Sequence, residues 1–400
     1  MTNMKKTMMI CAMMSLALGA GAQGNNTGMG GEDGNYESLA SRLFKLEKKS
    51  DAFNVYFNYA SAFQEAYDGS AWGSSFKNKQ ARLEVKGSFG KFSYRFRHRL
   101  NKANGAQGED NFAKATDILS VGYQINDKLG VTGGKMCQNW GGFEFDENPM
   151  CIYQYSDMVD YMDNFMAGVN LSFKPVPSQE FDLNVTNAYN NKLAQEYGAD
   201  LMVKKENGKT EAVEAARHPL TYILLWSGNF FGDKLQTRWS VGTQTQAKNQ
   251  SSKMVMLGQK LNLPNLQWYF DYMGAFDDVD RLGIATSDLA QLRGEGNVRF
   301  GKVNYNSFVT KVNWQFVTRW NLMLKGMYET ASVSKIDDLK NYRKALGYFA
   351  SLEYYPIKSQ DCRLFLAYIG RSYKFTDKCK LADYNTSRIE LGFMYRIKAF

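Results

Sequence analysis

Hydrophobic and polar residues alternate with a period of two along most of the chain after residue 51. In the stretch FSYRFRHRL (92–100), aromatic and apolar residues alternate with a polar row that contains Arg95, Arg97 and Arg99. Successive side chains of a β-strand point to opposite faces, so this period predicts strands rather than helices. The predicted strands, sixteen in number, span residues 52–63, 79–89, 92–100, 117–125, 129–136, 164–173, 180–186, 220–228, 234–245, 253–260, 265–273, 303–316, 320–330, 344–355, 362–373 and 387–398.

The predicted connections between these strands alternate between long and short. Long connections at 64–78, 101–116 and 137–163 alternate with short ones such as 90–91 and 126–128. Outer-membrane barrels have short periplasmic turns and long extracellular loops, and their tilted strands need about 9–11 residues to cross the bilayer. We therefore expect residues 51–400 to form an all-β fold, a transmembrane antiparallel β-barrel of about 16 strands with both termini in the periplasm.

One face of the predicted strands carries apolar and aromatic residues and no Lys, Arg, Asp or Glu in the strand interiors. Phe165, Val169 and Phe173 lie on this face of their strand. A Lys or Arg at the bilayer midplane costs a barrel about 2–4 kcal/mol, so an uncharged face suits contact with lipid. The mean hydropathy of −0.45 fits both a barrel with a polar interior and a large soluble sandwich, but the alternation of connections favours the barrel.

The N-terminus has the features of a signal peptide. Lys5 and Lys6 precede an apolar stretch, and Ala20-Gly21-Ala22 forms an A-x-A cleavage site, so we expect residues 1–22 to direct export. Within residues 23–50 we expect a disordered Gly/Asn-rich segment followed by a short periplasmic helix at 36–49. Its heptad-like spacing suits either an amphipathic helix packed on the protein or an oligomerising helix.

The opposite face of the strands collects charged residues, with basic ones in excess. The chain carries a net charge of +9 without any basic run, which argues against a nucleic-acid binder. Rows of arginine in a pore concentrate anions and select for them. The alternative is that these arginines pair with carboxylates and stiffen the wall. The fourteen inward basic candidates are Arg82, Lys86, Arg95, Arg97, Arg99, Lys135, Arg238, Lys311, Lys325, Arg363, Arg371, Arg388, Arg396 and Lys398, and the six acidic ones are Glu84, Asp182, Asp271, Glu329, Glu353 and Glu390.

The long connection at 137–163 contains six carboxylates and no Lys or Arg. If it folds into the barrel, its acids face a basic wall and set a transverse field across a constriction. The alternatives are a solvated surface loop and a Ca²⁺ site built from its carboxylates. The six acids are Glu144, Asp146, Glu147, Asp157, Asp160 and Asp163.

The sequence offers little for catalysis or metal binding. The strand neighbours of His98 offer no nucleophile, and His218, the second histidine, lies in a predicted loop. An outer-membrane lipid hydrolase is therefore a weak alternative, and we expect no enzyme activity and no cofactor. Cys137 and Cys151 either pair as a disulfide or remain free thiols, and no metal-binding spacing is present. A surface adhesin or structural barrel with a plugged lumen also remains open, since the predicted loops 187–219 and 274–302 are long.

Two segments resemble a known family. The run GVTGGKM…WGGFEF (130–145) begins on the fifth predicted strand and leads into the long third loop. The C-terminal RIELGFMYRIKAF (388–400) is similar to a barrel-assembly signal. It differs in that Phe400 is one residue out of phase with the outward row of the last strand. With the signal peptide and sixteen strands, these segments resemble the phosphate-selective porin O/P family of Gram-negative outer membranes.

The resemblance implies a homotrimer of water-filled channels in the bacterial outer membrane, in contact with lipid and lipopolysaccharide. It also implies that Arg82, Arg95, Arg97, Arg99 and Lys135 shape the passage of anions, phosphate among them, together with the inward third loop. The acid-rich loop departs from the family and favours a general porin for anions and small polar solutes with a modest anion preference.

Overall fold

The computed structural model describes residues 38–44, 52–106, 108, 110–205, 208–357 and 359–400. The predicted signal peptide (1–22), the segment 23–35 and half of the predicted helix 36–49 lie outside the described residues. Within that helix, α2 (Leu39–Phe44) is helical, and the Ala40 N–H donates a hydrogen bond to the Ala399 carbonyl at 3.1 Å. Among the described residues, no helix is long and apolar enough to span a membrane.

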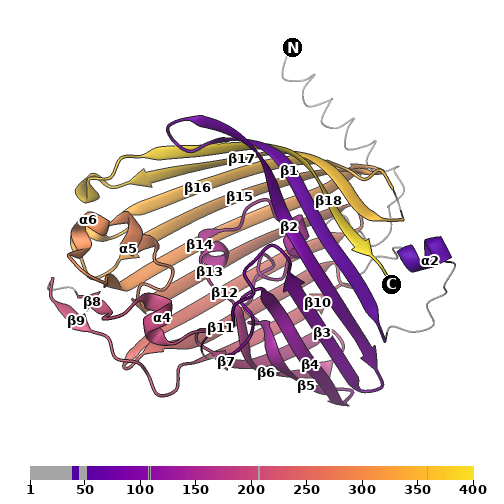
Figure 1. The fold of residues 1–400 in the computed structure, drawn as a ribbon, viewed down its shortest axis with the longest axis horizontal. Coiled ribbons are helices and arrows are strands. Elements are labelled where there is room, and N and C mark those ends of the chain that lie inside the picture. The colour runs from indigo at the N-terminus through magenta and orange to yellow at the C-terminus, as the bar shows by residue number, and fades with distance from the viewer. Residues whose placement is uncertain (1–37, 45–51, 107, 109, 206–207, 358) are drawn as a thin grey trace.

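The described strands form one closed antiparallel barrel. Eighteen strands belong to the sheet, and all but the short β8 and β9 make up the wall, which gives the sixteen strands predicted. Closure comes from antiparallel pairing of β1 with β18, in which Tyr56 pairs with Lys398 and Tyr67 with Ser387. Figure 1 shows the strands running obliquely along the barrel.

The wall strands lie close to the predicted ranges, and most extend further. They are β1 (Asn54–Tyr67), β2 (Trp72–Phe89), β3 (Phe92–Arg99), β4 (Thr116–Asn126), β5 (Leu129–Cys137), β6 (Phe165–Val176), β7 (Gln179–Asn187), β10 (Leu220–Phe230), β11 (Leu235–Ala247), β12 (Gln250–Leu263), β13 (Leu266–Val279), β14 (Val298–Val317), β15 (Trp320–Val333), β16 (Arg343–Tyr354), β17 (Asp361–Phe375) and β18 (Tyr384–Lys398).

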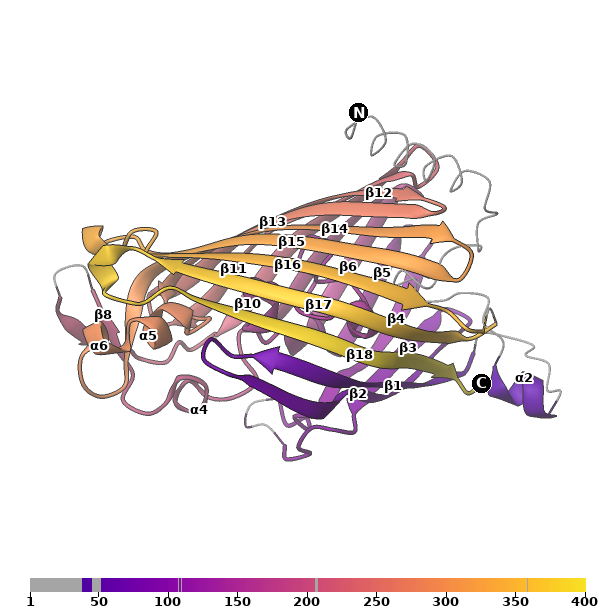
Figure 2. The same ribbon diagram turned by 90° about the horizontal axis from the view of Figure 1, so that it is seen from above.

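The connections at the two ends of the barrel differ in length and structure. At the end that carries α2 and the C-terminus, the turns are short (Figure 2). At the opposite end, the longer connections hold short helices and a small hairpin (Figure 1). These elements are η2 (Pro149–Cys151), α3 (Asp157–Asp160), α4 (Leu193–Tyr197), β8 (Met202–Lys204), β9 (Thr210–Ala212), α5 (Ile284–Asp288), α6 (Ala290–Arg293), η3 (Asp337–Leu339) and η4 (Asp377–Cys379).

Two of the predicted loops are wrong. The expected loop at 64–78 is a tight turn, because β1 and β2 continue as a hairpin as far as the Tyr67–Trp72 pair. Asp68 stabilises this turn by accepting hydrogen bonds from the Ser70 and Ala71 N–H groups at 2.8 and 3.0 Å. The connection at 246–252 is also a tight turn between Ala247 and Gln250. Polar residues at the rims of these strands interrupt the alternation of apolar and polar residues, so the strand ends are not predicted.

The outer surface has the apolar character predicted for contact with lipid. Large apolar and aromatic side chains are exposed on successive outward positions, where a soluble protein would bury them. Phe165 differs from the prediction that it faces lipid, because the Arg97 and Arg99 guanidinium groups lie 5.2 and 5.8 Å from the centre of its ring. Examples of the exposed row are Leu119, Val121 and Tyr123 on β4 and Leu364, Leu366 and Tyr368 on β17.

The interior contains a hydrophobic cluster as well as polar walls. Methionines on β12, β13 and β15 pack with Trp140, Phe143 and Met158 from the connection between β5 and β6. Trp140 is 1% exposed. This packing lies on one side of the lumen, and a cavity lies beside β2 and β3.

Candidate permeation site

Four arginines on β2 and β3 form one wall of the site, called here the arginine wall (Arg82, Arg95, Arg97 and Arg99). The antiparallel register pairs Arg82 with Arg99 and Glu84 with Arg97, so these side chains share the inner face. Pairing with carboxylates, the alternative that the sequence left open, occurs in this row, since the Arg95 Nε atom lies 2.9 Å from a Glu84 carboxylate oxygen on β2.

Asp117 is the second carboxylate of the arginine wall, and the sequence pattern did not assign it to the interior. Its position in the alternation matches that of the outward-facing Leu119. A β-bulge between Arg97 and His98 shifts the register with β4 at this point, and an extra residue in a strand redirects the side chains beside it. The Asp117 carboxylate lies 2.8 Å from Arg99, 3.4 Å from Arg97 and 3.8 Å from Arg82.

The opposite wall of the site is the connection between β5 and β6, residues 138–164, which lies inside the barrel. Its chain turns sharply at Gly142, whose φ is +84° and whose replacement by a larger residue would bring a Cβ atom within 3.2 Å of the Asp271 carboxylate. That carboxylate accepts hydrogen bonds from the Phe143 and Glu144 N–H groups, both at 2.8 Å. This contact fixes the turn at the WGG segment (140–142) near the start of the connection.

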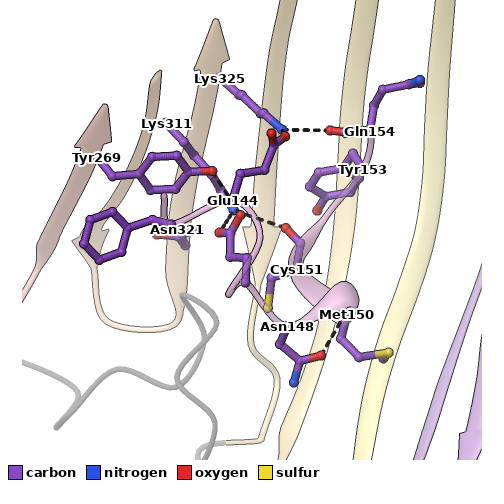
Figure 3. A network of polar contacts seen from close by, with 12 residues as sticks. Glu144, Asn148, Met150, Cys151, Tyr153, Gln154, Tyr269, Lys311, Asn321 and Lys325 are labelled. Carbon is purple, nitrogen blue, oxygen red and sulfur yellow. Dashed lines mark hydrogen bonds and ion pairs between the residues drawn. The ribbon is translucent and has the colours of Figure 1, made fainter. Parts of the chain in front are cut away.

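Ion pairs attach this connection to the inner faces of β14 and β15 (Figure 3). Glu144 pairs with Lys325, and Glu147 pairs with Lys311. The Lys325 ammonium also donates a hydrogen bond to the Gln154 carbonyl at 2.9 Å. Glu144 and Lys325 are almost completely buried, so removing either partner leaves an uncompensated charge.

A second set of contacts holds the α3 part of the connection to β15, β16 and β17. Asp157 pairs with Arg343 at 2.6 Å and with Arg371 at 2.9 Å, and its N–H donates to Glu329 on β15. The two arginines hold the pKa of the Asp157 carboxyl below its usual range, against the effect of burial. The Tyr153 hydroxyl donates to Glu353 at 2.7 Å, which adds a further attachment to β16.

A cavity of about 520 Å³ separates the arginine wall from the connection 138–164. All four arginines of the wall line it, and so do Asp146, Glu147, Asp160 and Asp163. Glu144 and Asp157 do not line it, because they are buried in the contacts described above. The remaining lining includes Lys102 from the loop after β3, the aromatic residues Phe145, Tyr155, Tyr161 and Phe165, and Cys137.

Lys135 does not line this cavity. It is 2% exposed, and its ammonium lies 2.8 Å from Asp110 and 5.5 Å from the centre of the Phe112 ring. The register pairs it with Leu119, which is exposed on the outer surface. Its predicted role beside the arginine wall therefore finds no support in the geometry.

The other candidate groups are placed as follows. Cys137 and Cys151 are free thiols, one of the two alternatives the sequence left open. No group of three or more His, Cys, Asp or Glu side chains in the described part of the chain could hold a metal ion. His98 Nδ1 lies 3.0 Å from the Thr116 hydroxyl, which ties the bulged ends of β3 and β4 together.

Several solved structures share this fold at low sequence identity. The outer-membrane channel DcaP of Acinetobacter baumannii matches with a TM-score of 0.58 and 10% identity, over 88% of this chain and 98% of that chain. An anion-selective porin from Comamonas acidovorans matches with a TM-score of 0.54 and 9% identity, over 86% and 99%. OmpF of Salmonella typhi, in complex with daunomycin, matches with a TM-score of 0.53 and 10% identity, over 88% and 99%.

Comparison of the sequence itself identifies the family. No curated protein matches the chain significantly. The family described as phosphate-selective porin O and P matches residues 53–397, which include every strand of the barrel wall except the last residue of β18. The chain therefore belongs to the phosphate-selective porin O and P family and is a porin of the bacterial outer membrane, which provides passive uptake through its barrel.

Proposed function

We propose that this porin conducts small anions in modest preference to cations, and that it acts as a channel and not as an enzyme. The observation that carries the proposal is the arginine wall, where four guanidinium groups pair with two carboxylates of the described residues, Glu84 and Asp117. Guanidinium groups match carboxylate and phosphate oxygens in a bidentate way. Inorganic phosphate and small carboxylates are thus the solute class that this wall suits.

The charge balance around the whole cavity supports a modest preference rather than a strict one. Among the described residues that line the cavity and the described residues that pair with them within 4 Å, seven cations face six carboxylates. The cations are Arg82, Arg95, Arg97, Arg99, Lys102, Arg238 and Lys311, and the carboxylates are Glu84, Asp117, Asp146, Glu147, Asp160 and Asp163. A single positive charge in excess favours anions without excluding small neutral or cationic solutes.

The proposed assembly is a homotrimer surrounded by outer-membrane lipid and lipopolysaccharide, exported by means of residues 1–22. A trimer form is described for OmpT of Vibrio cholerae, which shares the fold with a TM-score of 0.52 and 10% identity. Chemical crosslinking of the protein extracted in mild detergent tests this assembly, and a product that stops at a monomer or dimer contradicts it.

Reversal potentials in planar bilayers test the selectivity. A salt gradient of potassium chloride should give a reversal potential on the anion-selective side, and replacing chloride by phosphate should retain current. The triple variant Arg95→Gln, Arg97→Gln, Arg99→Gln should lose the anion preference, because it removes three of the seven cations. Lys253→Gln, on an exposed lysine of β12 far from the cavity lining, is the matched control. A reversal potential unchanged in the triple variant refutes the assignment of selectivity to this wall.

A further inference from the structure

The cavity beside the arginine wall holds charges of both signs on separate segments of the chain. The arginine wall comes from β2 and β3, whereas Asp160 and Asp163, which also line the cavity, lie at and just after the end of α3 in the connection 138–164. Both aspartates are exposed to the cavity. A solute in the cavity therefore meets positive charge from the arginine wall and negative charge from the connection 138–164.

These two aspartates differ from the other acids of the connection, because they are not neutralised by ion pairs. Within the described residues, neither has a Lys or Arg nitrogen within 4 Å, whereas Asp146 pairs with Arg238 and Glu147 with Lys311. Asp163 accepts hydrogen bonds only from neutral donors, the Asn190 amide at 2.9 Å and the Phe165 N–H at 3.4 Å. The more distant charges around them are Lys102 near Asp163 and Arg371 near Asp160.

A solute with a single charge is attracted by one set of these charged groups and repelled by the other. An anion held at the arginine wall is repelled by Asp160 and Asp163, and a cation held at these aspartates is repelled by the arginines. A solute that carries an anionic group and an ammonium group a few bonds apart is attracted both by the arginine wall and by the two aspartates. Tyr155 and Tyr161 also line the cavity and offer contact to an apolar body between the two charges.

We propose that this cavity binds small zwitterions, such as amino acids and very short peptides, with the carboxylate at the arginine wall and the ammonium at Asp160 and Asp163. The volume of about 520 Å³ lies within the range of small-molecule sites, roughly 300–1,000 Å³. This inference rests on the proposed function, since it requires the channel to be open to small charged solutes. It goes beyond that function by naming a solute class defined by two charges.

The test compares two solutes with the same carbon chain, 4-aminobutyrate and butyrate, as inhibitors of the chloride current through single channels near neutral pH. Both carry the carboxylate, and only the first carries an ammonium group. We expect half-inhibition at about 2- to 5-fold lower concentration for 4-aminobutyrate, the range that one exposed ion pair supplies. The double variant Asp160→Asn, Asp163→Asn should remove this difference by weakening 4-aminobutyrate while butyrate binds as well as before or better.

The matched control is Asp337→Asn, which neutralises an exposed aspartate paired with Lys340 outside the cavity lining. It should keep the difference between the two solutes. Equal inhibition by the two solutes in the unmodified porin, or a difference that persists in the double variant, overturns the inference. A porin that carries no chloride-selective current would instead overturn the proposed function, so the two failures are distinguishable. Heat-modifiable migration in gels verifies that each variant is a folded barrel.

Discussion

Replacing Asp117 by Asn should increase the anion preference of the porin. Asp117 is 2% exposed and has the guanidinium groups of Arg82, Arg97 and Arg99 within 4 Å. The substitution keeps the size of the side chain and an oxygen that can accept a hydrogen bond from Arg99. It removes one negative charge, so the excess of positive charge around the cavity rises from one to two.

The size of the effect follows from the distance between this charge and a passing ion. A unit charge about 6 Å from the ion contributes about 0.7 kcal/mol even at the permittivity of bulk water. That energy corresponds to about a threefold change for each ion, in opposite directions for chloride and potassium, so the chloride-to-potassium permeability ratio should change by about tenfold. The same substitution should destabilise the barrel by about 3 kcal/mol, near the lower limit for breaking a buried pair, since the arginines lose a partner but keep a hydrogen bond.

Reversal potentials measured in a potassium chloride gradient check the prediction. The matched control is Asp182→Asn, which neutralises a buried inward carboxylate of β7 that accepts a hydrogen bond from Asn170 and does not line the cavity. We expect its permeability ratio to stay near that of the unmodified porin. A ratio in Asp117→Asn that is unchanged, or that moves toward cations, would refute the reasoning that charge on this wall sets the selectivity.

Three further predictions concern the loop and the thiols. Glu144→Gln should destabilise the connection between β5 and β6 by about 3–5 kcal/mol, because it removes the buried ion pair with Lys325. We expect Trp140 fluorescence to change at a lower denaturant concentration and the single-channel current to become noisier. A steady current and an unchanged denaturation midpoint would contradict this prediction. Although Asp160 faces the cavity, partial desolvation inside the barrel raises the pKa of its carboxyl. Acidification should therefore neutralise it at higher pH than an ordinary aspartate and increase the anion preference. Asp160→Asn should lack this early step in a pH series. Thiol titration of the denatured chain without residues 1–22 should find four free thiols, and a count of two would mean that a disulfide forms.

The sequence predicts the barrel because lipid contact imposes a strict rule on each strand. Rows such as Leu364, Leu366 and Tyr368 must be apolar wherever the wall meets the bilayer. That rule ends at the rim, where water replaces lipid. This is why the hairpin that ends at Tyr67 and Trp72 was mistaken for a long loop.

The details of the site were less accessible from the sequence, for two physical reasons. Asp117 was missed because alternation assumes an unbroken register, and the bulge beside Arg97 breaks it. An isolated acid on a strand next to an arginine-rich strand is the signal that points to such a residue. The ion-pair partners of Glu144 and Asp157 could not be predicted from the sequence. Lys325 and Arg371 lie more than 180 residues further along the chain, and only closure of the barrel brings each pair together.

The acidity of the connection between β5 and β6 is compatible with anion passage because its carboxylates have different surroundings. Three of them, Glu144, Glu147 and Asp157, form ion pairs with basic residues on β14, β15 and β16, and these pairs hold the connection in place. Only Asp160 and Asp163 present charge to the cavity without an ion-pair partner in the described structure. Since the cations around the cavity exceed the carboxylates by one, selectivity depends on a small balance. Single substitutions on either side should therefore shift it in opposite directions, with a lost aspartate favouring anions and a lost arginine favouring cations.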